Sequence, residues 1–129
     1  MIELFLTAHI IYTINSSQME NCSQWGSNLD GCYVEETNNI YVNETTKSLK
    51  DFVLYHEIGH SLFKLNFPSN LFTDKEEMAN QFAKYIYLQK YPKLGTLITG
   101  NRFWYFREFC GLPCVDEILK IDIPRSLED

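Results

Sequence analysis

The apolar positions in the first third of the chain form short runs that predict β-strands. The run from Leu4 to Ile14 predicts a buried strand. Two further runs, at 32–35 and 40–43, are rich in β-branched and aromatic residues and are separated by Glu36–Asn39. Because asparagine tolerates the positive φ that tight turns need, these two runs predict a hairpin.

Later apolar positions follow a helical period. A broad apolar stripe predicts a mostly buried helix that begins near Ser48 and ends at the proline-containing segment 67–70. Asp51 follows Ser48 at the spacing of a capping box, which would satisfy free N–H groups of the first turn. Gly59 costs about 1 kcal/mol relative to alanine inside a helix. We therefore expect another backbone, that of the hairpin, to pass close to it.

Three more helices are predicted towards the C-terminus. The first begins at Thr73 or Asp74 and ends at about Gln89, with acidic residues in the first turn, where the helix dipole favours them. The aromatic-dense segment 102–109 predicts a helix that fills the core, and 115–121 predicts a short final helix. The expected class is α+β, with a small antiparallel or mixed sheet packed on the first helix and on a second, Glu-bearing helix.

Composition fits one folded domain and argues against two classes of partner. The chain has 129 residues, of which 45% are hydrophobic and 15% aromatic, enough for the core of a single domain spanning 1–129. The net charge is -6 and there is no basic patch, so nucleic acid is not an expected partner. No stretch approaches the length of a membrane-spanning helix, so no membrane role is expected.

The compartment has two interpretations. Met1–Ile14 lacks the basic region and cleavage site of a signal peptide, which favours the cytoplasm. The chain also has four cysteines, which could form two disulfides as in an extracellular protein or stay as free thiols: Cys22, Cys32, Cys110 and Cys114. Three N-glycosylation sequons point weakly outward, at Asn15, Asn21 and Asn43.

The segment with the clearest chemistry is His56-Glu57-Ile58-Gly59-His60, an HExxH pattern. On a helix, residues four apart lie one above the other, so two imidazoles can reach one Zn²⁺ at about 2.0–2.1 Å. Glu57 lies beside the metal rather than on it, where it can accept a proton from a zinc-bound water. The remaining histidine, His9, lies in a predicted strand and is not an expected ligand.

A third zinc ligand is expected on the following helix. Catalytic zinc usually has three protein ligands and one open position, and two histidines with one glutamate are a common set. No histidine follows His60, so a carboxylate must complete the set. Glu76 and Glu77 are the alternatives, and each is also placed to cap its helix. Asn80 lies one turn after Glu76 and could orient a ligand histidine, which favours Glu76.

The segments HEIGH at 56–60 and EEMANQFA at 76–83 resemble the ImmA/IrrE family of small zinc metallopeptidases. That family carries HExxH on one helix and an E-x-x-A-N-x-F-A pattern on the next. The similar region runs from about Ile40 to Tyr91, under half of the chain. Met78 stands where many members have a second glutamate, and this leaves the metal ligands intact.

The resemblance implies a fold, an activity and a set of site residues. The fold is a reduced thermolysin-like (zincin, gluzincin) core with a short sheet, an HExxH helix and a Glu-bearing helix. The activity is zinc-dependent hydrolysis of peptide bonds in a protein or peptide substrate, in known members often a transcriptional repressor. The implied zinc ligands are His56, His60 and Glu76, with Glu57 as the general base.

The oxyanion donor that a peptidase needs is not evident. The candidates are Tyr12, Tyr33, Tyr85, Tyr105 and Arg102. One alternative is therefore a zinc-binding but catalytically degenerate protein-interaction module. Another is a metal-free protein in which Glu76 and Asp51 only cap helices.

The strand at 40–43 lies just before the helix that carries both histidines. As an edge strand it could add an extended peptide through main-chain hydrogen bonds, with Ile40, Tyr41 and Val42 as substrate-binding residues. The alternative is an ordinary sheet strand.

Overall fold

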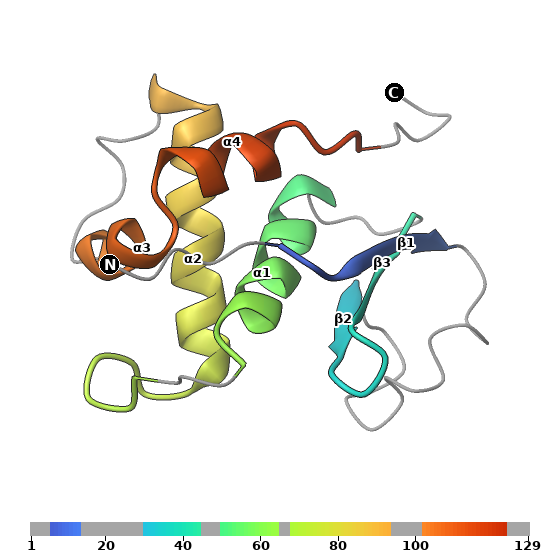
Figure 1. Cartoon of the computed structure of the whole chain (residues 1–129), viewed down its shortest axis with the longest axis horizontal. Helices are drawn as coiled ribbons and strands as arrows, with labels where there is room; N and C mark the ends of the chain where they lie inside the picture. The colour runs from blue at the N-terminus through green and yellow to red at the C-terminus, as the bar shows by residue number, and fades with distance from the viewer. Residues whose placement is uncertain (1–5, 14–29, 45–49, 65–67, 94–101, 124–129) are drawn as a thin grey trace.

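Figure 1 shows the computed structural model of the chain, which describes residues 6–13, 30–44, 50–64, 68–93 and 102–123. The strands are β1 (His9–Thr13), β2 (Gly31–Val34) and β3 (Asn39–Asn43), and the helices are α1 (Lys50–Leu62), α2 (Lys75–Lys90), α3 (Phe103–Phe109) and α4 (Leu112–Leu119). A small mixed sheet with helices confirms the predicted α+β class. Helix α1 lies between the sheet and α2, and α3 and α4 pack against α2 (Figure 1).

The sheet has β3 in the centre, with β1 parallel on one side and β2 antiparallel on the other. The predicted hairpin of β2 and β3 is confirmed. Asn38 in its turn has φ 56°, the left-handed conformation that asparagine tolerates. Strand β1 begins at His9, later than the predicted Leu4, and residues 1–5 and 14 lie outside the described part of the chain.

The prediction that residues 40–43 could form an edge strand is wrong. Ile40, Tyr41 and Val42 have backbone partners on both sides, in β1 and in β2. The side chains of Ile40 and Val42 are fully buried. These residues therefore cannot receive an extended substrate by β-addition, and the edge strands of this sheet are β1 and β2.

Helix α1 ends at Leu62, before the predicted stop at 67–70. The N–H of Phe63 still donates to the carbonyl of Gly59, at 3.1 Å. The ring of Phe63 then enters the core, where it contacts the rings of Phe82, Tyr105, Phe106 and Phe109. The predicted cap, Ser48, lies outside the described residues.

The prediction that the hairpin passes close to Gly59 is also wrong, because α2 occupies that place. A Cβ on Gly59 would lie 3.1 Å from Cδ1 of Phe82 and 3.3 Å from Cα of Ala79. Glycine thus lets α1 and α2 approach each other closely. The hairpin makes its own close approach at Gly31, where a Cβ would lie 2.8 Å from Cγ1 of Val53 on α1.

The C-terminal helices close the aromatic core. Helix α3 confirms the prediction for 102–109, and α4 begins at Leu112, earlier than the predicted 115. Gly111 takes the N-cap position, and the proline that follows fits a first turn, where its missing N–H is not needed. A disulfide joins Cys110 to Cys114, and both cysteines are buried.

Cys32 is disulfide-bonded as well, and none of the cysteines that the structure describes is free. The remaining cysteine, Cys22, lies outside the described residues.

Candidate metal centre

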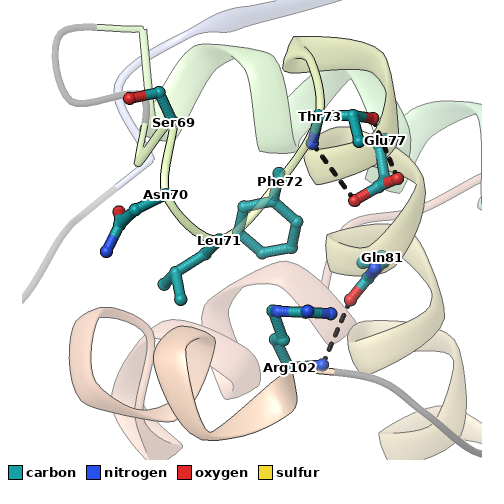
Figure 2. Close-up of a pocket in the computed structure, with 8 residues that line it drawn as sticks. All are labelled: Ser69, Asn70, Leu71, Phe72, Thr73, Glu77, Gln81 and Arg102. Atoms are coloured by element: carbon teal, nitrogen blue, oxygen red, sulfur yellow. Dashed lines mark hydrogen bonds between the residues drawn. The ribbon is translucent and has the colours of Figure 1, made fainter.

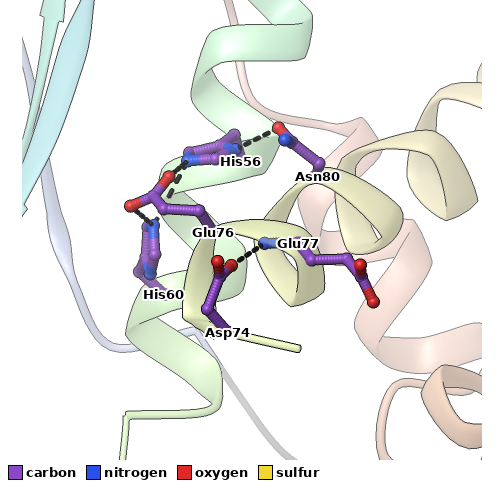
Figure 3. Close-up of polar contacts among 6 residues, drawn as sticks. All are labelled: His56, His60, Asp74, Glu76, Glu77 and Asn80. Atoms are coloured by element: carbon purple, nitrogen blue, oxygen red, sulfur yellow. Dashed lines mark hydrogen bonds and ion pairs between the residues drawn. The ribbon is translucent and has the colours of Figure 1, made fainter. Parts of the chain in front are cut away.

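Two histidine rings and one carboxylate converge where α1 meets the first turn of α2 (Figure 3). The Nε2 atoms of His56 and His60 lie 3.2 Å apart. One oxygen of Glu76 lies 2.9 Å from Nε2 of His56, and the other lies 3.1 Å from Nε2 of His60. The two histidines share a face because they are four residues apart on α1, and Glu76 reaches them from the start of α2.

The distances among these three groups suit the ligands of a small cation. Ligands at about 2.0–2.1 Å from a tetrahedral zinc lie about 3.4 Å from one another. The separations here are 2.9, 3.1 and 3.2 Å. Imidazole nitrogen and carboxylate oxygen are also the usual protein ligands of zinc. The residues present therefore fit a zinc ion in both spacing and chemistry.

Asn80 controls the protonation of the His56 ring. Its side-chain oxygen Oδ1 lies 2.8 Å from Nδ1 of His56. An amide oxygen only accepts hydrogen bonds, so Nδ1 carries the proton and, in the neutral ring, Nε2 carries the lone pair. That lone pair faces the lone pairs of the Glu76 carboxylate. A cation must lie between them: either a metal ion, or the proton of a charged His56 ring that donates to Glu76.

Burial favours the neutral ring of His60 as well. It lowers the pKa of His60, against an opposing effect of the Glu76 charge. A neutral imidazole is the form that binds a metal. The rings are shielded, with side-chain exposures of 16% for His56 and 17% for His60, whereas Glu76 is 59% exposed. Solvent therefore reaches the centre from the Glu76 side.

Glu57 borders the same centre. The ligand atoms of His56, Glu57 and His60 lie within 4.8 Å of one another. Glu76 is nevertheless the better third ligand, because its oxygens directly contact both Nε2 atoms. Glu57 faces β2 instead, with its Cγ 3.5 Å from the position that a Cβ of Gly31 would take. This places Glu57 beside the metal position, where the sequence predicted a general base.

The carboxyl of Glu57 is buried and has no hydrogen-bond partner among the described residues. Burial raises the pKa of Glu57 from 4.5 to about 8, and the nearby charge of Glu76 adds to the increase. Buried polar groups nearly always have partners, so an unpartnered carboxyl marks a functional position.

Glu77 caps α2 and does not contact the histidines. Its backbone N–H donates to Oδ1 of Asp74 at 2.8 Å, and the hydroxyl of Thr73 donates to its Oε2 at 3.0 Å. Figure 3 shows the Glu77 side chain pointing away from both rings. Of the two alternatives, Glu76 therefore contacts the histidine rings, whereas Glu77 takes part in the N-terminal cap of α2. Helix α2 begins at Lys75, just after the predicted start at Thr73 or Asp74, and Asp74 is its N-cap.

The side chains considered as oxyanion donors make other contacts. Tyr12, Tyr33 and Tyr85 each donate their hydroxyl to an oxygen elsewhere, at 3.1, 2.9 and 2.7 Å. Tyr105 is buried among the aromatic rings of the core. Arg102 belongs to a separate hollow. The three tyrosine hydroxyls are therefore already engaged with other oxygens.

That hollow, of about 500 Å³, opens beside the first turn of α2 (Figure 2). Its lining residues are Ser69, Asn70, Leu71, Phe72, Thr73, Glu77, Gln81 and Arg102. Because Glu77 rather than Glu76 lines it, the hollow lies on the side of α2 away from the histidines. It is therefore distinct from the metal centre.

Lys64 was not among the residues singled out from the sequence. Lys64 follows His60 by four residues, just after α1, and its Nζ donates to the hydroxyl of Tyr33 at 3.1 Å. The spacing after His60 was the available signal. His9, by contrast, is exposed at the start of β1, apart from the metal group, as expected.

Comparisons with protein-family models, curated proteins and solved structures find no significant match to this chain. In the part that the structure describes, no helix has the length and apolar character needed to cross a bilayer. Functional inference therefore rests on the geometry of the chain's own residues.

Proposed function

We propose that this chain is a zinc-dependent metallopeptidase that hydrolyses peptide bonds in a protein or peptide substrate, with a reduced zincin-like fold of the ImmA/IrrE type. The observation that carries the proposal is the convergence of His56 Nε2, His60 Nε2 and the Glu76 carboxylate. The layering of sheet, α1 and α2 is compatible with such a fold (Figure 1).

Each residue of the centre has a role in this proposal. His56, His60 and Glu76 hold Zn²⁺, and Asn80 fixes the orientation of the His56 ring. Bound zinc would supply polarisation of a substrate carbonyl and a lowered pKa for a nearby water. Glu57 takes a proton from the attacking water and passes it to the leaving amine. No hydrogen bond from the described residues holds its carboxyl. A bound cation beside it would favour the charged carboxylate, which burial alone disfavours.

Metal content and hydrolysis can be tested separately. Zinc measured on purified protein should approach one ion per chain. Glu57→Gln should keep the zinc and lose hydrolysis, because it changes the base and none of the ligands. His60→Ala should lose the zinc. A Glu57→Gln variant as active as the parent would refute the base assignment.

A zinc-binding, catalytically degenerate interaction module is the second candidate function. It is favoured by the tyrosine hydroxyls, three of which already donate to other oxygens. The two functions differ in one measurement: zinc-loaded protein that cleaves no protein or peptide, with or without chelator, supports the module.

A further inference from the structure

Lys64 forms a fixed contact with the edge strand β2. Its Nζ donates to the hydroxyl of Tyr33 at 3.1 Å and lies 5.8 Å from the centre of the Tyr33 ring. The same hydroxyl donates to Oδ1 of Asn38 at 2.9 Å, and Nδ2 of Asn38 donates to Oγ1 of Thr7 at 3.1 Å. This chain of hydrogen bonds holds the phenol, and the phenol in turn holds the ammonium group.

The Lys64–Tyr33 pair lies close to the proposed catalytic residues. Lys64 follows His60 by four residues, in the turn just after α1 ends at Leu62. Tyr33 is two residues after Gly31 on β2, and Gly31 packs beside the side chain of Glu57. Residues two apart on a strand share a face, so Tyr33 faces α1 as Gly31 does. Strand β2 thus extends from the proposed base to Lys64.

Among the residues that the structure describes, the ammonium of Lys64 has no anionic partner. Among the described residues no carboxylate lies within 4.0 Å of it, and the Tyr33 hydroxyl is its one hydrogen-bond acceptor. A lysine ammonium has three donors, so two remain. By comparison, Lys90 at the end of α2 pairs with Asp51 at 3.4 Å. In a chain of net charge -6, a half-buried cation without a carboxylate beside a proposed active centre suits an acidic ligand.

We infer that the Lys64–Tyr33 pair binds a carboxylate of the substrate, from an aspartate or glutamate side chain near the scissile bond. The inference rests on the proposed peptidase function and adds its specificity. An extended peptide advances about 3.3 Å per residue. Because Lys64 follows the proposed ligand His60 by only four residues, we expect the acidic residue within about two positions of the cleaved bond. Tyr33 acts by holding the ammonium in place.

The alternative role for this pair is purely structural: the contact between the lysine and the tyrosine can stabilise the packing of the end of α1 on the sheet. The two roles differ in what the charge does. A purely structural tie affects stability and treats all substrates alike, whereas a carboxylate-binding ammonium changes which peptides are cleaved.

The test uses the full chain loaded with zinc and a defined library of peptides with varied sequence, with cleavage sites identified by mass spectrometry. The variants are Lys64→Gln, Lys64→Arg, which keeps the charge, and Lys84→Gln as a matched control. Lys84 is exposed on α2, outside the proposed site, and its substitution removes the same net charge. Zinc content and circular dichroism verify that each variant is folded.

We expect the parent to favour aspartate or glutamate within two positions of the cleaved bond by about tenfold, as a charged hydrogen bond allows. The preference should disappear in Lys64→Gln and persist in Lys64→Arg and Lys84→Gln. Cleavage without an acidic preference, or a preference that survives in Lys64→Gln, overturns the inference and leaves the peptidase proposal standing. Absence of cleavage by every zinc-loaded protein overturns the peptidase proposal and this inference with it.

Discussion

Asn80 offers a direct test of how the metal centre is organised, because it contacts a ligand without being one. Its Oδ1 accepts the Nδ1 hydrogen of His56 at 2.8 Å, in an exposed position. Asn80→Ala leaves all three proposed ligands in place but removes the acceptor that selects the tautomer of His56. A ring whose second nitrogen has no acceptor spends part of its time with the proton on Nε2, where it cannot bind a metal.

The size of the effect follows from the exposure of this contact. Loss of an outer hydrogen-bond partner of a ligand histidine typically weakens metal binding by about 10- to 100-fold. Water can partly replace an exposed amide oxygen, so we expect the lower end, about tenfold, or about 1.4 kcal/mol. Asn80→Asp keeps an acceptor and should bind zinc at least as well as the parent.

The assay is competition for zinc between the metal-free protein and a chromophoric chelator at neutral pH. Lys84→Ala serves as the control, since Lys84 is exposed one turn further along α2. If folded Asn80→Ala bound zinc within about twofold of the parent, the orienting role of Asn80 would be refuted.

Three further predictions concern the frame around the centre. Gly59→Val forces side-chain atoms between α1 and α2 and should cost about 1–3 kcal/mol, seen as a lower melting temperature and weaker zinc binding; unchanged values would contradict the close helix contact. Burial raises the pKa of Tyr12 from 10.0 to about 12, so its contribution to stability is complete below pH 10 and lost as pH rises towards 12. In denaturant titrations, the unfolding free energy of Tyr12→Phe should therefore fall less steeply between pH 10 and 12 than that of the parent. An equal dependence on pH in the two proteins would contradict the raised pKa of Tyr12. Replacing Cys110 and Cys114 by alanine should lower unfolding stability by about 2 kcal/mol, while zinc binding persists; an equally stable variant would show that the bridge contributes little.

Local sequence signals predicted the parts of the fold that neighbouring residues determine. The hairpin followed from β-rich runs around an asparagine turn, and Asn38 has the positive φ that such a turn uses. The start of α2 followed from its cap, which Asp74 and Glu77 form. The shared direction of His56 and His60 followed from helix periodicity alone.

The errors have a common cause in contacts between residues far apart in the chain. The neighbour of Gly59 is α2 rather than the hairpin, and the sequence shows that a glycine needs space without showing what fills it. Strand β3 is central because β1, from an earlier part of the chain, pairs with its second edge. The contact of Lys64 with Tyr33 spans 31 residues, beyond the reach of any helical or strand period.

Glu57 is where folding and the proposed chemistry have opposite requirements. Its side chain is 7% exposed, and no described residue offers its carboxyl a hydrogen bond. A buried polar group without a partner destabilises the fold, and Glu57 also lies close to the negative charge of Glu76. A helix cap or a structural ion pair would have satisfied this carboxyl, as the Glu77 N–H satisfies Asp74 and the Thr73 hydroxyl satisfies Glu77 at the start of α2. A proton acceptor must instead stay unbound until water and substrate arrive. The unsatisfied carboxyl beside two converging imidazoles is the arrangement that the proposed role of Glu57 as general base requires.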